Sequence, residues 1–413
     1  MRISELPRRT SMRRWTTVTV ASLALAAGSL GIGSAVTAHA ATAAKPVQTT
    51  VKDGTWGAST DRTGLTIANQ TVRDIVRTSI GGSDLQVKLS NVFGSQPVTF
   101  GDVSVGVVQS GAALVPGSSQ ELTFSGNTSV TVPAGAEVLS DPLPGNVPAQ
   151  SNLAVSIFVQ GASGTVTGHN LATQTNFVST DGDHVGDDAA TAFTTTTTRW
   201  PYLDGLIVNE PKNVGTVVAL GDSITDGFRS TVGADNRWPD FLARRLLTKP
   251  ASQQYGVLNE GISGNKILTD GAGVSALNRF DRDVLAQPNA KTIIFLEGIN
   301  DLSGGATADQ VIAGDRQLIA RAHAANRCII GATLTPFGTS SANEQAEVIT
   351  VNNFIRSSGE FDSVVDFNKA VADPSDPNRM LPAFDSGDGL HPNDAGYQAM
   401  ANAINLKALS CKR

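Results

Sequence analysis

The sequence predicts a chain with two parts, an all-β sandwich or jelly roll followed by an α/β region built on a parallel sheet. Between residues 51 and 207, apolar side chains alternate with polar or small ones, and turn-forming residues recur throughout. From residue 215, short continuous apolar runs alternate with helix-like segments instead. The length of 413 residues also favours two domains once an N-terminal leader is removed.

Residues 1–40 have the pattern of a secretion signal peptide. Basic residues come first, residues 18–36 are apolar, and Ala38-His39-Ala40 places small residues where signal peptidase reads them. We expect cleavage after Ala40, a linker over residues 41–50, and secretion by the general route or, given two adjacent arginines, the twin-arginine route. The alternative is a membrane anchor, but glycines interrupt the apolar segment and the cleavage site follows at once.

The charge balance excludes two classes of partner. The leader holds five Arg and one Glu, so 26 basic and 36 acidic residues remain, a net charge of −10. Because the sequence contains no basic stripe, binding to nucleic acid or to an anionic membrane surface is not expected. No later segment has the continuous apolarity of a membrane span. We therefore expect an extracellular monomer without stable membrane insertion.

The β-rich half is predicted from period-two patterns, in which one face of each strand is buried. The clearest are Leu85/Val87/Leu89, Val103/Val105/Val107 and Leu153/Val155/Ile157/Val159. The five threonines of residues 194–198 are expected to form a strand, because Phe193 and Trp200 flank them. We assign residues 51–207 to a β-sandwich accessory domain whose role the sequence does not indicate.

The second half, residues 215–413, alternates between strand and helix patterns. The expected strands are residues 217–220, 257–258, 292–296, 329–334 and 364–367, and the expected helices are residues 238–247, 274–286, 308–325, 343–357 and 393–406. Continuous apolar strands separated by helices predict a parallel sheet covered on both faces. Ligands in such sheets bind at the carboxyl ends of the strands, so residues that follow a strand are the first candidates for a site.

Four short blocks fall at those places. They are Gly221-Asp222-Ser223 after the first strand, Gly261-Ile262-Ser263-Gly264-Asn265 after the second, Gly298-Ile299-Asn300-Asp301 after the third, and Asp388-Gly389-Leu390-His391-Pro392 before the last helix. Each block alone is an ordinary turn or helix cap. A serine hydroxyl needs an adjacent base to become a good nucleophile. In combination, the blocks therefore favour Ser223 as nucleophile, His391 as its base and Asp388 as the carboxylate that orients the imidazole.

These blocks resemble the signature of the SGNH hydrolases, also called the GDSL esterase/lipase family, whose signature residues match Ser223, Gly264, Asn300 and His391. The resemblance spans residues 215–408 and implies a flavodoxin-like, three-layer α/β/α fold. It also implies an oxyanion hole made of the backbone N–H groups of Ser223 and Gly264 and the side-chain amide of Asn300. No cofactor is implied. A β-rich domain ahead of the hydrolase domain resembles secreted two-domain bacterial members, including exported carbohydrate esterases.

Other candidate groups fit less well. Ser263 lies in a block that lacks the final glycine of an α/β-hydrolase elbow. The remaining histidines after the leader have no triad-like context: His169, His184 and His323. Four aspartates crowd one glycine-containing loop: Asp181, Asp183, Asp187 and Asp188. Their spacing is not that of an EF-hand, so we interpret the loop as solvated and expect no metal site.

Contacts to substrate and the state of the cysteines are open to alternatives. Phe337 follows the fourth strand and is a candidate wall of the substrate pocket, and Asp226 and Arg229 are further candidates, with helix capping as the alternative. Cys328 and Cys411 are the only cysteines, and an even count in an exported protein favours a disulfide between them. Two free buried thiols are the alternative.

The expected function is that of a secreted serine esterase that cleaves carboxylic esters through an acyl-serine intermediate. Acetyl or feruloyl esters of carbohydrates are the favoured substrates, whether small molecules or polysaccharides. A lipase or aryl esterase, an acyltransferase to a sugar hydroxyl and a non-enzymatic polysaccharide-binding protein are the alternatives. The aromatic content of 5% offers no obvious platform for stacking against sugars.

Overall fold

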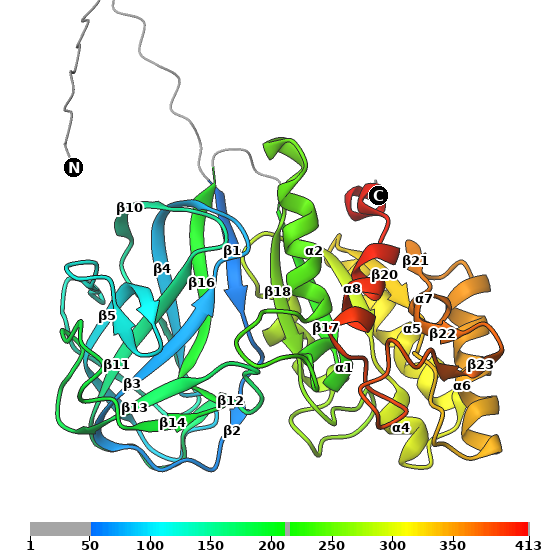
Figure 1. Cartoon of the computed structure of the whole chain (residues 1–413), viewed down its shortest axis with the longest axis horizontal. Coiled ribbons are helices and arrows are strands. Elements are labelled where there is room, and N and C mark those ends of the chain that lie inside the picture. The colour runs from blue at the N-terminus through cyan, green and yellow to red at the C-terminus, as the bar shows by residue number, and fades with distance from the viewer. Residues whose placement is uncertain (1–50, 211–214, 412–413) are drawn as a thin grey trace, which may run out of the picture. The chain divides into compact units, whose positions relative to one another are not determined.

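The structure is a computed structural model that describes residues 51–210 and 215–411 (Figure 1). The expected signal peptide and the linker over residues 41–50 lie outside the described residues. Both described ranges belong to one compact unit, so the expected division into domains 51–207 and 215–413 stays a prediction. None of the described helices has the length and apolarity that crossing a membrane requires.

The N-terminal region consists of antiparallel strands in three sheets. The largest runs in the order β14-β13-β3-β11-β5-β6, with β7 and β8 also paired to β5; the second runs β1-β16-β4-β10, with β9 paired to β4; and the third runs β15-β12-β2. The strands are β1 (Val51–Gly57), β2 (Asp61–Arg62), β3 (Ala68–Arg77), β4 (Gly82–Ser90), β5 (Val98–Ser110), β6 (Ala113–Leu114), β7 (Gln120–Glu121), β8 (Val130–Val132), β9 (Glu137–Leu139), β10 (Leu143–Val147), β11 (Asn152–Ala162), β12 (Thr167–His169), β13 (Asn176–Asp181), β14 (Thr195–Thr197), β15 (Trp200–Pro201) and β16 (Leu203–Glu210).

Alternating side chains of the two larger sheets share one apolar core, as the period-two pattern predicts. Val87 of β4 and Val103 of β5 are fully buried in it, and the rings of Trp56 and Trp200 meet edge to face 4.9 Å apart. Val107 departs from the pattern, because its side chain is 43% exposed. The expected threonine strand is confirmed as β14.

The C-terminal region is built on a five-stranded parallel sheet with the order β18-β17-β19-β20-β21. Its strands are β17 (Thr216–Gly221), β18 (Gly256–Gly261), β19 (Ala290–Leu296), β20 (Cys328–Ala332) and β21 (Ser363–Val365). In chain order these strands lie 2-1-3-4-5, which is the flavodoxin-like arrangement. The predicted three-layer α/β fold is therefore confirmed.

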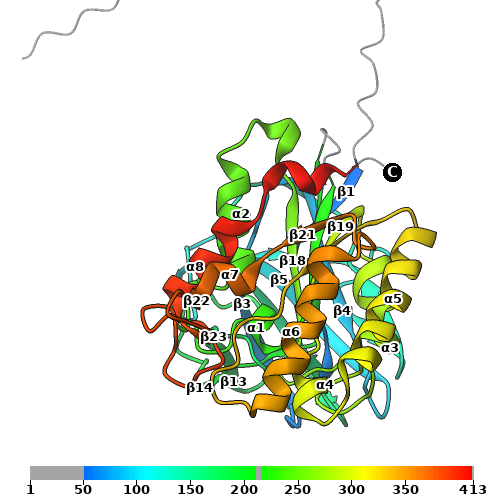
Figure 2. The same ribbon diagram turned by 90° about the vertical axis from the view of Figure 1, so that its right-hand side faces the viewer.

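Helices cover both faces of this sheet (Figure 2). Helices α2 (Trp238–Leu247) and α8 (Asp394–Ala403) pack together on one face, and α3 (Ala276–Phe280), α5 (Ala308–Ala324) and α6 (Ala342–Ser357) lie on the other. The shorter elements are α1 (Ser223–Asp226), η1 (Ala251–Gln253), η2 (Asp281–Leu285), α4 (Ile299–Ser303), α7 (Phe367–Val371), β22 (Ala372–Asp373), β23 (Asp376–Met380) and η3 (Leu406–Ser410). The helix expected over residues 274–286 is divided into α3 and the π-helical turn η2.

The first strand of the β-rich region packs against β18 of the parallel sheet. The Gly54 N–H donates to Thr216 Oγ1 at 3.0 Å, and the Val257 N–H donates to Ser79 Oγ at 3.0 Å. Between these contacts, Gly256 lies so close to the carbonyl oxygen of Gly54 that a Cβ atom at residue 256 would overlap it. A glycine is therefore required where the two backbones meet.

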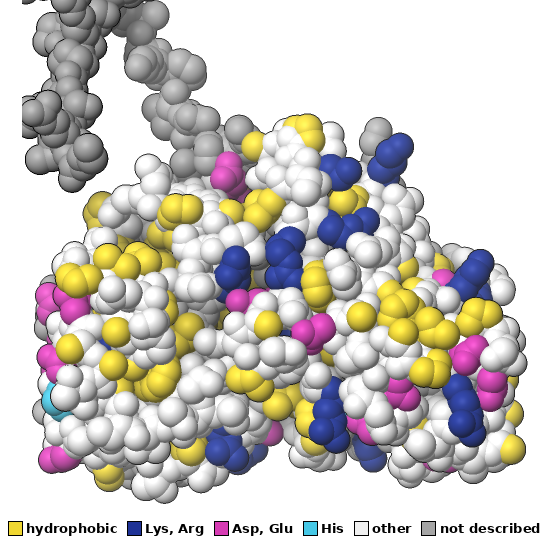
Figure 3. Space-filling model, in the orientation of Figure 1, with side chains coloured by type: hydrophobic (Ala, Val, Ile, Leu, Met, Phe, Trp, Pro, Cys, Tyr) yellow, Lys and Arg dark blue, Asp and Glu magenta, His cyan; other side chains and the backbone are white. Residues whose placement is uncertain are grey.

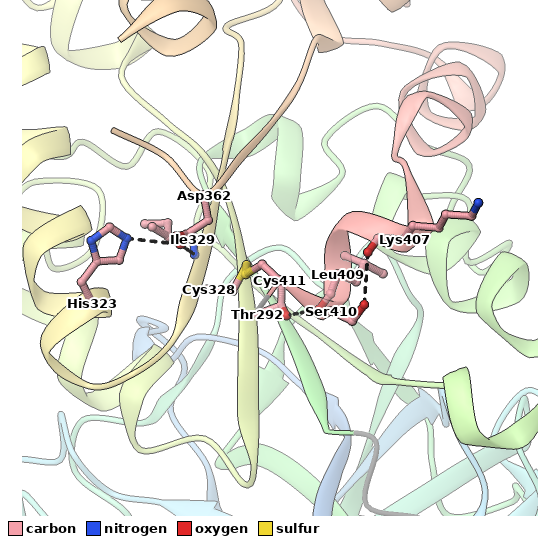
Figure 4. The surroundings of a disulfide bond; sticks show 9 residues. All are labelled: Thr292, His323, Cys328, Ile329, Asp362, Lys407, Leu409, Ser410 and Cys411. Carbon is pink, nitrogen blue, oxygen red and sulfur yellow. Dashed lines mark hydrogen bonds and ion pairs between the residues drawn. A yellow bond between two sulfur atoms is a disulfide. The ribbon is translucent and has the colours of Figure 1, made fainter. Parts of the chain in front are cut away.

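Cys328 and Cys411 form a disulfide, which confirms the expected pairing (Figure 4). The bond joins the first residue of β20 to the C-terminal segment after η3, across 83 residues of sequence. The adjoining helix η3 is held by the Thr292 hydroxyl, which donates to the Leu409 carbonyl at 2.7 Å. The end of the chain is thus fastened to the parallel sheet by one covalent and one hydrogen bond.

Charged side chains of both signs are interspersed on the face shown in Figure 3.

The four aspartates of the acidic loop each have a separate partner instead of facing a common point. Asp181 accepts from Asn69, Asp183 from the backbone of Val185 and Asp188 from the backbone of Gly117, and Asp187 contacts His184.

Candidate active site

The proposed nucleophile lies in a tight turn between β17 and the short helix α1. Ser223 is the first residue of α1, and the Asp222 side chain caps that helix by accepting from the Ile224 N–H at 3.0 Å. Burial raises the pKa of Asp222 to about 7. The N–H groups of Ile224, Thr225 and Asp226 all donate to Asp222, whereas the Ser223 N–H, at the first position of the helix, has no acceptor within the helix.

Ser223, His391 and Asp388 lie in one hydrogen-bonded row. Ser223 Oγ is 2.9 Å from His391 Nε2, and His391 Nδ1 is 2.9 Å from Asp388 Oδ2. A carboxylate oxygen accepts, so Nδ1 carries the proton and Nε2 is left to accept from the serine hydroxyl. The structure therefore brings together the three predicted residues in the tautomer that a general base needs.

Asp388 is held in its charged form by its own loop. Partial burial raises its pKa, but donation from the backbone N–H and ring of His391 and from the Leu390 N–H outweighs burial and lowers the pKa to about 2. The Arg229 guanidinium lies 3.5 Å from the same carboxylate, with the Arg229 side chain 53% exposed. Arg229 thus contacts the triad carboxylate, and its contact with substrate stays a prediction.

Phe228 fixes the other side of the imidazole. Its ring meets the His391 ring edge to face at 4.7 Å. Its carbonyl accepts from the buried Tyr397 hydroxyl at 2.7 Å. Phe228 was not among the predicted site residues, because a phenylalanine shortly after a turn carries no signal of its own.

The two remaining signature residues meet beside the nucleophile turn. Gly264 has φ +80°, a left-handed conformation that glycine adopts without strain. The Asn300 amide, in the first turn of α4, donates to the Asn265 carbonyl at 2.9 Å. An amide has two N–H groups, so this bond leaves a second donor for an oxyanion. Asn300 and the loop containing Gly264 are thereby tied to each other.

Asp226 has a different environment from the one we expected. It is 2% exposed, and both of its carboxylate oxygens interact with protein groups. Asp226 Oδ2 accepts from the Ser263 N–H and from the Ser263 hydroxyl, each at 2.8 Å. Asp226 thus anchors the loop that carries Gly264, and its contact with substrate stays a prediction. The same bonds make Ser263 a donor to a carboxylate instead of a nucleophile.

Arg279, which the sequence analysis also missed, joins the strand ends that carry the site. Its fully buried guanidinium donates to the carbonyls of Gly221 at 3.0 Å and Glu260 at 2.7 Å, and to the Asn265 side chain at 3.0 Å. The end of β17, the end of β18 and the Gly264 loop are therefore held by one side chain. The buried Asp283 carboxylate lies 3.3 Å away and balances its charge, and the buried Glu297 side chain lies 3.8 Å away.

Phe337 lies beside a cavity of about 200 Å³ that is also lined by Val348, Ile349 and Pro377. Of the described residues that line this cavity, none belongs to the triad. The segment is nevertheless close to the triad loop, because the Gly338 N–H donates to the Gly389 carbonyl at 2.9 Å. The role of Phe337 as a wall for substrate stays a prediction.

Residues 219–399 match the sequence model of the GDSL-like lipase/acylhydrolase family. Residues 219–399 are therefore a GDSL-like lipase/acylhydrolase domain. No curated protein matches the chain. The resemblance to the SGNH/GDSL family is thus confirmed over the region that contains the triad, whereas the match does not extend to the β-rich region.

The chain is also similar to several solved structures. They include a G-D-S-L family protein from Desulfitobacterium hafniense DCB-2, an acetylxylan esterase from Geobacillus stearothermophilus and an α/β hydrolase enzyme from the metagenome of Lake Arreo, Spain. Each is 22% identical, with a TM-score of 0.38. The matches cover 46%, 48% and 48% of this chain and 97%, 97% and 95% of the other chains, in the same order.

Proposed function

We propose that this protein is a secreted serine esterase that cleaves carboxylic esters through an acyl-serine intermediate. The observation that carries the proposal is the 2.9 Å contact between Ser223 Oγ and His391 Nε2, with Asp388 holding the opposite ring nitrogen. A hydroxyl paired with an oriented imidazole is the arrangement that activates serine. The disulfide supports export, because such bonds persist in oxidising compartments.

In the proposed reaction, Ser223 Oγ bonds to the ester carbonyl carbon while His391 Nε2 takes its proton. The carbonyl oxygen becomes an oxyanion, which accepts from the N–H groups of Ser223 and Gly264 and from the Asn300 amide. Collapse breaks the bond to the alcohol, which leaves with the proton from His391. Water then repeats the sequence on the acyl-serine, releasing the acid and restoring the serine hydroxyl.

We propose acetyl or feruloyl esters of carbohydrates as the substrates. The support is the order of the two regions, since a β-rich region ahead of a hydrolase domain resembles exported carbohydrate esterases. The alternatives are hydrolysis of lipid or aryl esters and transfer of the acyl group to a sugar hydroxyl. The substrate comparison described below distinguishes them.

The test measures release of p-nitrophenolate from a short p-nitrophenyl ester by the wild type and Ser223→Ala. We expect the variant to lose at least about a thousandfold in rate. Ser358→Ala is the matched control: that hydroxyl accepts from the Glu360 backbone at the end of α6, and its loss should leave the rate unchanged. Equal rates in wild type and Ser223→Ala would refute the assignment.

The natural ester is identified by titrating the acid released from acetylated xylan, feruloyl esters and triglycerides. The carbohydrate proposal expects the highest kcat/KM on one of the first two. Preference for triglycerides would instead identify a lipase. An acceptor sugar that raises turnover and becomes acylated would identify a transferase.

A further inference from the structure

One side chain of the β-rich region contacts Asp226, the residue that anchors the loop carrying Gly264. His169, at the end of β12, is 3% exposed. Its Nδ1 lies 2.7 Å from the Ser59 carbonyl, and its Nε2 lies 3.0 Å from the Leu171 carbonyl and 2.9 Å from Asp226 Oδ1. Asp226 belongs to α1, the helix that begins with the nucleophile.

The surroundings of His169 require both of its ring nitrogens to donate. Carbonyl and carboxylate oxygens only accept, and each nitrogen faces at least one of them. Burial lowers the pKa of His169, but the charge of Asp226 and the hydrogen bonds outweigh it, and the pKa is raised above its usual value. His169 and Asp226 therefore form a buried ion pair. Both ring nitrogens and both carboxylate oxygens have hydrogen-bond partners.

The ion pair continues directly into the proposed oxyanion hole. While Asp226 Oδ1 contacts His169, Asp226 Oδ2 accepts both hydrogen bonds from Ser263. Ser263 immediately precedes Gly264, whose N–H is one of the proposed oxyanion donors. A shift of the Asp226 carboxylate would therefore move that N–H with it.

A second residue of the β-rich region reinforces the same point. Ser59, whose carbonyl faces His169, donates its hydroxyl to Glu260 Oε2 at 2.7 Å and accepts from Arg279 at 2.8 Å. Arg279 in turn holds the Gly264 loop through the Asn265 side chain. Two separate chains of contacts thus run from the β-rich region to the same loop.

We propose that the β-rich region is a positioning element of the esterase site and that His169 is its positioning residue. His169 holds Asp226, Asp226 holds Ser263, and Ser263 sets where the Gly264 N–H points. This inference rests on the proposed function, since it concerns the oxyanion hole of that reaction. An N–H group that is out of place by a fraction of an ångström stabilises the transition state less while leaving substrate binding nearly unchanged.

The test compares His169→Phe and His169→Gln with wild type in kcat and KM. We expect His169→Phe to lower kcat by about ten- to a hundredfold, less than the loss of a whole oxyanion donor, and to leave KM within about twofold. Glutamine keeps an N–H donor for Asp226, so His169→Gln should recover part of the lost kcat.

The matched control is Thr216→Val, which removes another hydrogen bond between the two regions. Thr216 Oγ1 accepts from the Gly54 N–H and also donates to the Pro288 carbonyl, at the opposite end of β17 from Ser223. This variant should lower the melting temperature without lowering kcat. If the His169 variants behave in the same way, with a lower melting temperature and wild-type kcat, the contact is merely structural and the proposal is wrong.

A second readout does not depend on ester hydrolysis. Amide hydrogen exchange over residues 261–268 should be faster in His169→Phe than in wild type and Thr216→Val. Unchanged exchange would overturn the positioning role even in an active enzyme. Faster exchange together with an inactive wild type would instead leave the positioning contact in place and reject the esterase assignment.

Discussion

The two regions of the molecule differ in how their functional groups are exposed. In the α/β region, the groups assigned to the reaction are partly accessible: Ser223 is 7% exposed and the His391 side chain is 13% exposed. In the β-rich region, His169 and Ser59 are buried, at 3% and 1%. Groups that react must meet the substrate, whereas groups that position others can be withdrawn from solvent entirely. Burial therefore distinguishes two roles in one network, and the following predictions test that distinction.

The largest effect is expected from Asp388→Asn, which changes a group in contact with the base. An amide N–H facing His391 Nδ1 would favour the tautomer with the proton on Nε2, which cannot accept from Ser223. We expect kcat to fall on the order of 10³- to 10⁴-fold with KM nearly unchanged, measured by steady-state hydrolysis. If kcat falls less in Asp388→Asn than in the His169 variants, the expectation that triad residues matter more to the rate than positioning residues is contradicted.

The same pair predicts the pH dependence of the rate. The pKa of Asp388 is lowered to about 2, so the fold favours its charged form. The stability that this adds is present above the ordinary value of 3.8 and is lost as the pH falls towards 2. Asp388 therefore stays charged between about pH 4 and 9, so protonation of this carboxylate should lower the rate only below about pH 4. A decline of the wild-type rate above pH 4 that disappears in Asp388→Asn would contradict the charged state assigned to Asp388.

A smaller loss is expected from Asn300→Ala, because it removes one donor and leaves the triad in place. We expect kcat to fall about 10²- to 10³-fold. Because Asn300 also donates to the Asn265 carbonyl, hydrogen exchange over residues 261–268 should rise in this variant too. If exchange rises while kcat does not fall, Asn300 supports the loop but does not serve as an oxyanion donor.

The smallest effect on activity is expected from breaking the Cys328–Cys411 bond, which lies at the opposite end of the sheet strands from the site. Closing a loop of 83 residues stabilises a fold by about 2–5 kcal/mol, mainly through the unfolded chain. Cys328→Ser with Cys411→Ser should lower the urea midpoint of unfolding without changing kcat. Unequal rates at a temperature where both proteins are folded would show that this contact reaches the site.

Local patterns were sufficient for the fold. Continuous apolar runs predicted each strand of the parallel sheet, and residues 238–247 form α2 as expected. The π-helical hydrogen bonding of η2 leaves no mark in apolar periodicity, so the break between residues 274 and 286 was missed. The alternation in the β-rich region identified its strands but did not determine how they divide among three sheets.

A site residue could be predicted from the sequence only where it lay in one of the four recognisable blocks. Ser223, Asp388 and His391 stood at strand ends or beside the last helix, and the structure brings them into contact. His169 lies 57 residues from its partner Asp226 and in the other region, so no spacing pointed to it. Arg279 lay within an expected helix, where an arginine usually faces solvent. Their roles arise from packing between regions, which one-dimensional patterns do not encode.

Gly256 gives this arrangement a consequence for ancestry. Because the backbone of Gly54 passes where a Cβ atom of residue 256 would lie, β1 can rest against β18 only if that position has no side chain. A relative with a larger residue at that position would have to hold the two strands further apart. We therefore expect glycine at the start of the second parallel strand in any relative whose two regions pack as they do here.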